Sequence, residues 1–118
     1  MAITELTHGT VKKITYEWTS HAATGDAEET TTKAYNGAIE RLVTVPGTAG
    51  DQPADNYDVT VEDSDEVDVL MGEGANRSDT TTQQVGAGDL GVVAYSRLTF
   101  KIDNAGNSNK GTVHLYIR

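Results

Sequence analysis

The side chains best suited to chemistry in this chain are the carboxylates between Glu62 and Asp68, the densest acidic cluster in the sequence. Asp63, Asp65 and Asp68 offer the hard oxygen ligands that Ca²⁺ prefers, and that ion takes about six to eight of them. The spacing only partly matches a calcium loop, because the glycine that lets an EF-hand loop turn is missing. The three aspartates are therefore a candidate calcium site, and the alternative is a charged chain reversal that faces solvent.

Three histidines are the only candidate general bases for a hydrolytic triad: His8, His21 and His114. No G-x-S-x-G elbow or other nucleophile motif accompanies them. Pairs of acids suited to glycoside hydrolysis are uninformative in a chain with 18 Asp and Glu residues. We therefore expect no enzymatic activity, no catalytic residues and no cofactor, and we expect His114 to be solvated or hydrogen-bonded on the polar face of its strand.

The composition narrows the class of partner. The chain has 118 residues, a formal net charge of −9 and no cysteine. Affinity for a phosphate backbone comes from Lys and Arg, so this charge argues against direct nucleic-acid binding and against anionic membrane surfaces. No disulfide or thiolate metal site can form. Neither a secretory signal nor an apolar run of about 20 residues is visible, so we expect a chain made and kept in the cytosol, or assembled there into something larger.

The strongest strand signal lies at the end of the chain, from Arg97 to Ile117. Two runs alternate between apolar and polar residues, which is the period of a half-buried strand. Their apolar positions are Leu98, Phe100 and Ile102, then Val113, Leu115 and Ile117. The residues between the runs tolerate a positive φ and favour a turn: Asn104, Gly106, Asn107, Asn109 and Gly111. The pattern predicts a β-hairpin that lays its apolar face on other strands.

Two further strand regions precede it. From Thr10 to Ser20 the apolar residues Ile14, Tyr16 and Trp18 share one face, and Trp18 is expected to anchor the core with its indole N–H bonded at the rim. Asn36-Gly37 is the strongest short-range hairpin signal in the sequence. It predicts a second hairpin over residues 29–45, with Ile39, Val43 and Val45 on one side of the returning strand, and Leu42 and Thr44 on the other.

The middle of the chain predicts shorter strands separated by loops. Residues 46–56 are dense in Gly, Pro and Asp and predict a loop that crosses between sheets. A strand is expected over residues 57–62, followed by a tight reversal at 63–66 and a short strand through Met71. Residues 80–85 predict a short strand, residues 86–91 a turn, and residues 92–96 a bend or short strand. No helix-period run of convincing length is visible.

This count of seven to nine short strands predicts an all-β protein, an antiparallel β-sandwich of jelly-roll type, with an immunoglobulin-like sandwich as the alternative. The sandwich domain is expected over residues 10–118. Residues 1–9 predict an N-terminal arm, either packed along a sheet edge or ordered by a partner. In that arm Ile3 and Leu6 are candidate partner-binding residues.

Four stretches carry a resemblance to a known group of proteins: GTVKKITYEWTS, NGAIERLVTVPG, NYDVTVEDSDEVDVLMGEGANRS and the ending NKGTVHLYIR. They resemble small virion proteins of tailed bacteriophages. The resemblance runs through nearly the whole chain from Gly9 and is one of strand and turn texture. Where this sequence has Glu66, the resemblance leads us to expect a glycine.

The resemblance implies a capsid decoration (cement) protein: a non-enzymatic structural protein on the outside of the virion head, made in the host cytoplasm. Its expected partners are the major capsid protein and further copies of itself as a homo-oligomer. Two alternatives stay open. One is a head–tail or tail structural component, and the other is an accessory β-sandwich module that binds a carbohydrate or receptor.

Overall fold

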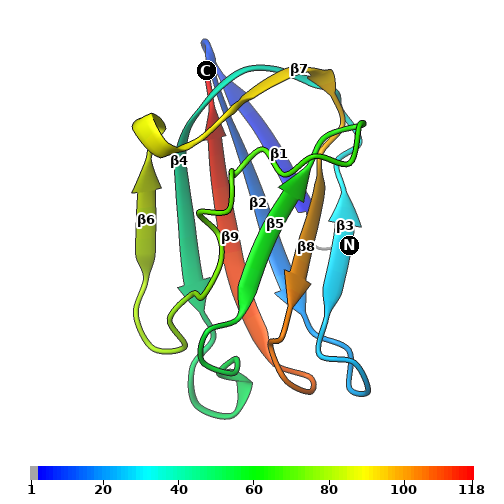
Figure 1. The fold of residues 1–118 in the computed structure, drawn as a ribbon, viewed down its shortest axis with the longest axis vertical. Helices are drawn as coiled ribbons and strands as arrows, with labels where there is room; N and C mark the ends of the chain where they lie inside the picture. The colour runs from blue at the N-terminus through cyan, green and yellow to red at the C-terminus, as the bar shows by residue number, and fades with distance from the viewer. Residues whose placement is uncertain (1–2) are drawn as a thin grey trace.

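The protein is an antiparallel β-sandwich of two sheets, seen in a computed structural model that describes residues 3–118 (Figure 1). The larger, six-stranded sheet has the order β1-β2-β9-β4-β6, with β7 also paired to β4. Its strands are β1 (Ile3–His8), β2 (Val11–Thr19), β9 (Lys110–Ile117), β4 (Tyr35–Pro46), β6 (Gln83–Gly86) and β7 (Val92–Ser96). The three-stranded sheet has the order β3-β8-β5, formed by β3 (Ala27–Thr30), β8 (Thr99–Asp103) and β5 (Asp58–Glu62). The predicted all-β antiparallel sandwich is confirmed, and its jelly-roll subtype stays a prediction.

Helical structure is confined to two short 3₁₀ turns, Ala49–Asp51 and Ala87–Asp89, in the part of the chain described. Neither is long enough to cross a membrane, and no other helix is described between residues 3 and 118.

The core lies between the apolar faces of the two sheets. The inward residues of β2, β9 and β8 are those that alternation predicts, and all are almost completely buried: Ile14, Tyr16, Trp18, Val113, Leu115, Ile117, Phe100 and Ile102. Tyr16 from the large sheet meets Phe100 from the small one edge to face, with ring centroids 6.0 Å apart. Each such side chain contributes about 1.5–3 kcal/mol when removed from water, so the burial of these residues stabilises the packing of the two sheets.

The predicted C-terminal hairpin is wrong. Its two strands belong to different sheets, because β8 pairs with β3 and β5 whereas β9 pairs with β2 and β4. The connection between them therefore crosses the sandwich. The alternating pattern identified the buried faces correctly, but these faces meet across the core and do not lie side by side. Gly111, predicted as a turn residue, lies inside β9.

The predicted hairpin at Asn36-Gly37 is also wrong, since both residues lie within β4 and β3 pairs with β8. Gly37 has a φ of 128°, and a Cβ built on it would overlap the carbonyl oxygen of Arg118 and lie 2.8 Å from the carbonyl carbon. The glycine therefore serves a close approach of two backbones and a shift in the β4–β7 register.

The predicted face of β4 is wrong over most of the strand. Leu42 and Thr44 point into the core, while Val43 and Val45 are only half-buried on the other face. The cause is a register shift between Ile39 and Arg41 against β9. An inserted residue reverses the alternation, so that Ile39 and Leu42 both face inward.

The structure confirms some of the predictions for the middle of the chain and contradicts others. Residues 47–57 do connect the large sheet to the small one, and the reversal after β5 is present. The strand predicted to follow it is absent from the described chain, where residues 69–74 form turns, and the strand predicted at 80–85 begins at Gln83. The Trp18 indole is in the core as predicted, but within residues 3–118 its Nε1 has no hydrogen-bond partner.

Candidate functional site

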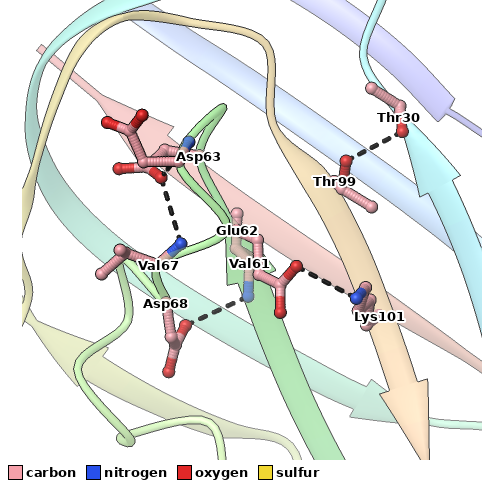
Figure 2. A network of polar contacts seen from close by, with 9 residues as sticks. Thr30, Val61, Glu62, Asp63, Val67, Asp68, Thr99 and Lys101 are labelled. Atoms are coloured by element: carbon pink, nitrogen blue, oxygen red, sulfur yellow. Dashed lines mark hydrogen bonds and ion pairs between the residues drawn. The ribbon is translucent and has the colours of Figure 1, made fainter.

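The acidic cluster forms a chain reversal in which the carboxylates accept hydrogen bonds from backbone N–H groups (Figure 2). Oδ1 of Asp63 accepts from the N–H of Asp65 at 2.9 Å and from that of Val67 at 3.1 Å. The backbone N–H of Glu66 donates to the carbonyl of Asp63 at 3.0 Å. Asp63 therefore closes the turn that leads out of β5, as aspartates commonly do.

Asp68 binds backbone in the same way on the next turn. Its Oδ1 accepts from the N–H of Val61 at 3.2 Å (Figure 2) and from that of Leu70 at 3.0 Å, and its Oδ2 accepts from the N–H of Gly72 at 2.9 Å. Asp65 is exposed. Between residues 3 and 118 no group of three or more His, Cys, Asp or Glu side chains is arranged to hold a metal ion. The structure thus uses Asp63 and Asp68 as turn acceptors, leaves Asp65 exposed, and does not bring the three side chains together.

The histidines lie on separate parts of the sandwich. His8 ends β1, His21 lies in the loop after β2, and His114 is on the outer face of β9. Nδ1 of His114 is 3.0 Å from Oγ1 of Thr15 on the neighbouring strand. The predicted hydrogen-bonded role of His114 is confirmed.

Of the predicted arm, residues 1–2 lie outside the described part of the chain, and residues 3–8 form the edge strand β1, paired with β2 from Ile3–Tyr16 to His8–Val11. Glu5 anchors it to the loop between β3 and β4. Oε2 of Glu5 accepts from the N–H and the hydroxyl of Thr32 at 3.0 and 2.7 Å. Oε1 accepts from the N–H of Lys33 at 3.1 Å and the hydroxyl of Tyr35 at 2.7 Å.

These hydrogen bonds affect the pKa of Glu5. Burial alone would raise the pKa of Glu5, but the hydrogen bonds from Thr32, Tyr35 and Lys33 outweigh it and hold the pKa below its ordinary value of 4.5. Burial, together with the hydrogen bond to Glu5, raises the pKa of Tyr35. The ionised carboxylate is therefore the form that fastens β1.

Replacing Glu5 by glutamine should lower the free energy of unfolding by about 2 kcal/mol near neutral pH, since an amide nitrogen cannot accept the Thr32 bonds. A depressed folded-state pKa stabilises above the unfolded-state value, and that stabilisation is lost as the pH falls through the folded-state value. The gap between wild type and Glu5→Gln should therefore close below about pH 4.5. Urea unfolding as a function of pH measures it, with the exposed Glu73→Gln as the matched control. If the difference in the free energy of unfolding between wild type and Glu5→Gln did not change with pH, this role of Glu5 would be contradicted.

Ile3 and Leu6, the predicted partner-binding residues, lie on opposite faces of β1 because an odd separation along a strand reverses the side. Ile3 is partly buried and packs against the core. Leu6 points outward and is 57% exposed. The two side chains therefore do not face one partner surface together.

Exposed hydrophobic residues lie on two neighbouring segments of the chain, and we define Val67, Met71, Val92 and Tyr95 as the apolar end patch. These are four of the five exposed large hydrophobic residues between residues 3 and 118, with exposed fractions of 58%, 69%, 70% and 78%. Contiguous exposed apolar surface in a protein commonly marks an interaction site.

Hydrogen bonds connect the two segments that carry the patch. The N–H of Gly91 donates to the carbonyl of Val69 at 3.0 Å, and the hydroxyls of Ser64 and Ser96 are 2.9 Å apart. A Cβ built on Gly91 would lie 3.5 Å from the sulfur of Met71. Figure 1 shows β7, which carries Val92 and Tyr95, running across the end of the sandwich toward which β5 points.

The backbone holds the patch in an uncommon conformation. Met71 and Tyr95 have φ values of 56° and 48°, in the left-handed region that non-glycine residues seldom adopt. Tyr95 is held there by a bond from its N–H to Oδ1 of Asn36 at 2.6 Å. Beside the patch, Glu66 has a φ of 63°, a backbone conformation that the glycine expected there from the resemblance would adopt more readily.

No protein family model matches the chain, and no curated protein matches it either. The patch therefore has to be interpreted from its own residues. Sequence reasoning missed it, because Val92 and Tyr95 were assigned to a short strand and Met71 to the end of another. The signal that was available is Tyr95 itself, an aromatic residue flanked by Ala94 and Ser96 outside any sustained alternation.

Proposed function

We propose that this chain is a non-enzymatic structural protein that binds the outer surface of a tailed-bacteriophage head as a decoration protein. The observation that carries the proposal is the apolar end patch, which lies on a β-sandwich of two packed sheets. The resemblance in strand and turn texture to small phage virion proteins supports it. The patch contacts the major capsid protein, and exposed acids nearby, including Asp65 and Glu66, favour a site with a basic rim.

Such binding stabilises the head through mass action. A protein that binds the assembled shell and not the free capsid subunit shifts the equilibrium toward the shell. Packed DNA presses outward on the lattice, so a contact that bridges neighbouring subunits opposes their separation. Contacts with several subunits add through effective concentration what one small interface lacks.

The test adds purified protein to heads that lack it. We expect saturable binding at a copy number comparable with that of the major capsid protein, and a higher temperature of head disruption, measured by the mass ratio of the two chains and by light scattering. Binding of far fewer copies would instead identify a head–tail or tail component. No binding, together with capture of a defined glycan, would identify the carbohydrate-binding alternative.

A further inference from the structure

The outer face of the large sheet carries a row of neighbouring residues that includes two cations. This row contains none of the residues of the apolar end patch. Register places Leu6 on β1 beside Lys13 on β2, Lys13 beside Tyr116 on β9, and Tyr116 beside Arg41 on β4. The Nζ of Lys13 lies 5.5 Å from the centroid of the Tyr116 ring, and the guanidinium carbon of Arg41 lies 4.4 Å from it. We call these four residues the Tyr116 row.

Lys13 and Arg41 bring two positive charges to this face in a chain of net charge −9. Burial lowers the pKa of His114, and Lys13 and Arg41 lower it further, against the opposing effect of Glu17 on the same face. Burial would raise the pKa of Tyr116, but the same two cations outweigh it and lower that pKa. Both directions agree with the geometry: the row concentrates positive charge around an aromatic ring and an exposed Leu6.

The opposite face of the sandwich is acidic. On the outer side of the small sheet, Lys101 is paired with Glu62 at 3.0 Å (Figure 2) and lies opposite Glu28 of β3 and Thr60 of β5. Asp58 and Asp103 are directly opposite each other at one end. We call Glu28, Asp58, Glu62 and Asp103 the acidic face, in which Glu62 is ion-paired with Lys101.

Charge decides how two copies can meet through these faces. A two-fold contact that places one Tyr116 row against another would bring Lys13 and Arg41 against their own copies, and juxtaposed like charges cost several kcal/mol. The row against the acidic face pairs opposite charges over two sheet surfaces, which stack about 10 Å apart when they pack.

We propose that the Tyr116 row of one copy docks on the acidic face of a second copy. Such a contact is heterologous, so each copy keeps one free row and one free acidic face, and association continues into a ring or an open chain. Tyr116 supplies the aromatic anchor, and Lys13 and Arg41 select carboxylates. This inference concerns the isolated protein and stands or falls independently of capsid binding.

The test is sedimentation velocity of the purified protein from about 1 μM to about 1 mM, a range that covers weak association. We expect species larger than a dimer at the upper end. Lys13→Glu/Arg41→Glu should weaken association about tenfold or more, as should Glu28→Gln/Asp103→Lys. Lys33→Glu/Arg97→Glu changes the net charge by the same amount as the first variant, at exposed residues outside both faces, and should associate like wild type.

Mixing the two defective variants gives the decisive result. The row variant retains an acidic face and the acidic-face variant retains a row, so an equimolar mixture should form a one-to-one dimer and nothing larger. Thermal melts first establish that each variant is folded. A wild type that stays monomeric throughout, a closed two-fold dimer, or a row variant that associates as well as the Lys33/Arg97 control would each overturn the proposal.

Discussion

Replacing Gly111 by alanine is expected to lower the free energy of unfolding by about 3 kcal/mol, because the added methyl has no room. Gly111 lies opposite Trp18 in the β2–β9 register. A Cβ built on it would overlap Cζ2 of the indole and lie 2.8 Å from Cε2. The indole has little space to retreat, since Trp18 is 1% exposed and its ring lies 5.4 Å from that of Tyr57.

Thermal unfolding followed by circular dichroism measures this effect in every variant, including those that lack Trp18, the only tryptophan. The midpoint should fall by roughly 10–15 °C for a domain of this size. Gly88→Ala is the matched control, because a Cβ there meets nothing within 4 Å. In Gly111→Ala/Trp18→Phe the smaller ring should accept the methyl, so the double variant should lose less than the sum of the two single losses. Strict additivity, or a Gly111→Ala variant as stable as the control, would contradict this packing.

Replacing Met71 and Tyr95 together by asparagine should weaken binding to purified heads about 100-fold, because the variant loses two exposed anchors of the proposed capsid contact. Asparagine suits the test for a backbone reason. Both positions have left-handed φ values, which asparagine adopts more readily than methionine or tyrosine. The variant should therefore melt at least as high as wild type while binding poorly.

Leu6→Thr is the control for this variant. Leu6 is a comparably exposed hydrophobic residue, but it lies on the outer face of β1 and not in the end patch. Occupancy of heads, measured by co-sedimentation over a range of concentrations, should be unchanged. If Leu6→Thr lost binding and the asparagine variant kept it, the capsid contact would be on the edge strand β1.

How far the sequence predicts this fold depends on what alternation encodes. An alternation of apolar and polar residues indicates which side of a strand is buried. For Ile14, Phe100 and Leu115 this indication is correct. It does not state which strand lies alongside, so β8 and β9 were paired wrongly although their inward faces were right. Asn36-Gly37 misled for a related reason, because Gly37 is required by the approach of Arg118, a contact distant in sequence.

The candidate sites show the same limit. The sequence predicts Asp63 and Asp68 as oxygen ligands for a cation. In the structure their carboxylates accept hydrogen bonds from N–H groups of turns that only the folded backbone defines. The apolar end patch joins residues from two segments that come together through Gly91 and Val69. The Tyr116 row likewise takes residues from separate strands. No local sequence pattern predicts that the residues of the apolar end patch, or those of the Tyr116 row, lie close together.

Cryo-electron microscopy of heads carrying this protein tests the central claim most directly. The account predicts density for many copies on the outer surface of the shell, with the end that bears Val67, Met71, Val92 and Tyr95 against the major capsid protein. Heads whose outer surface lacks such density, or copies that contact the shell only through other parts of the sandwich, would contradict it.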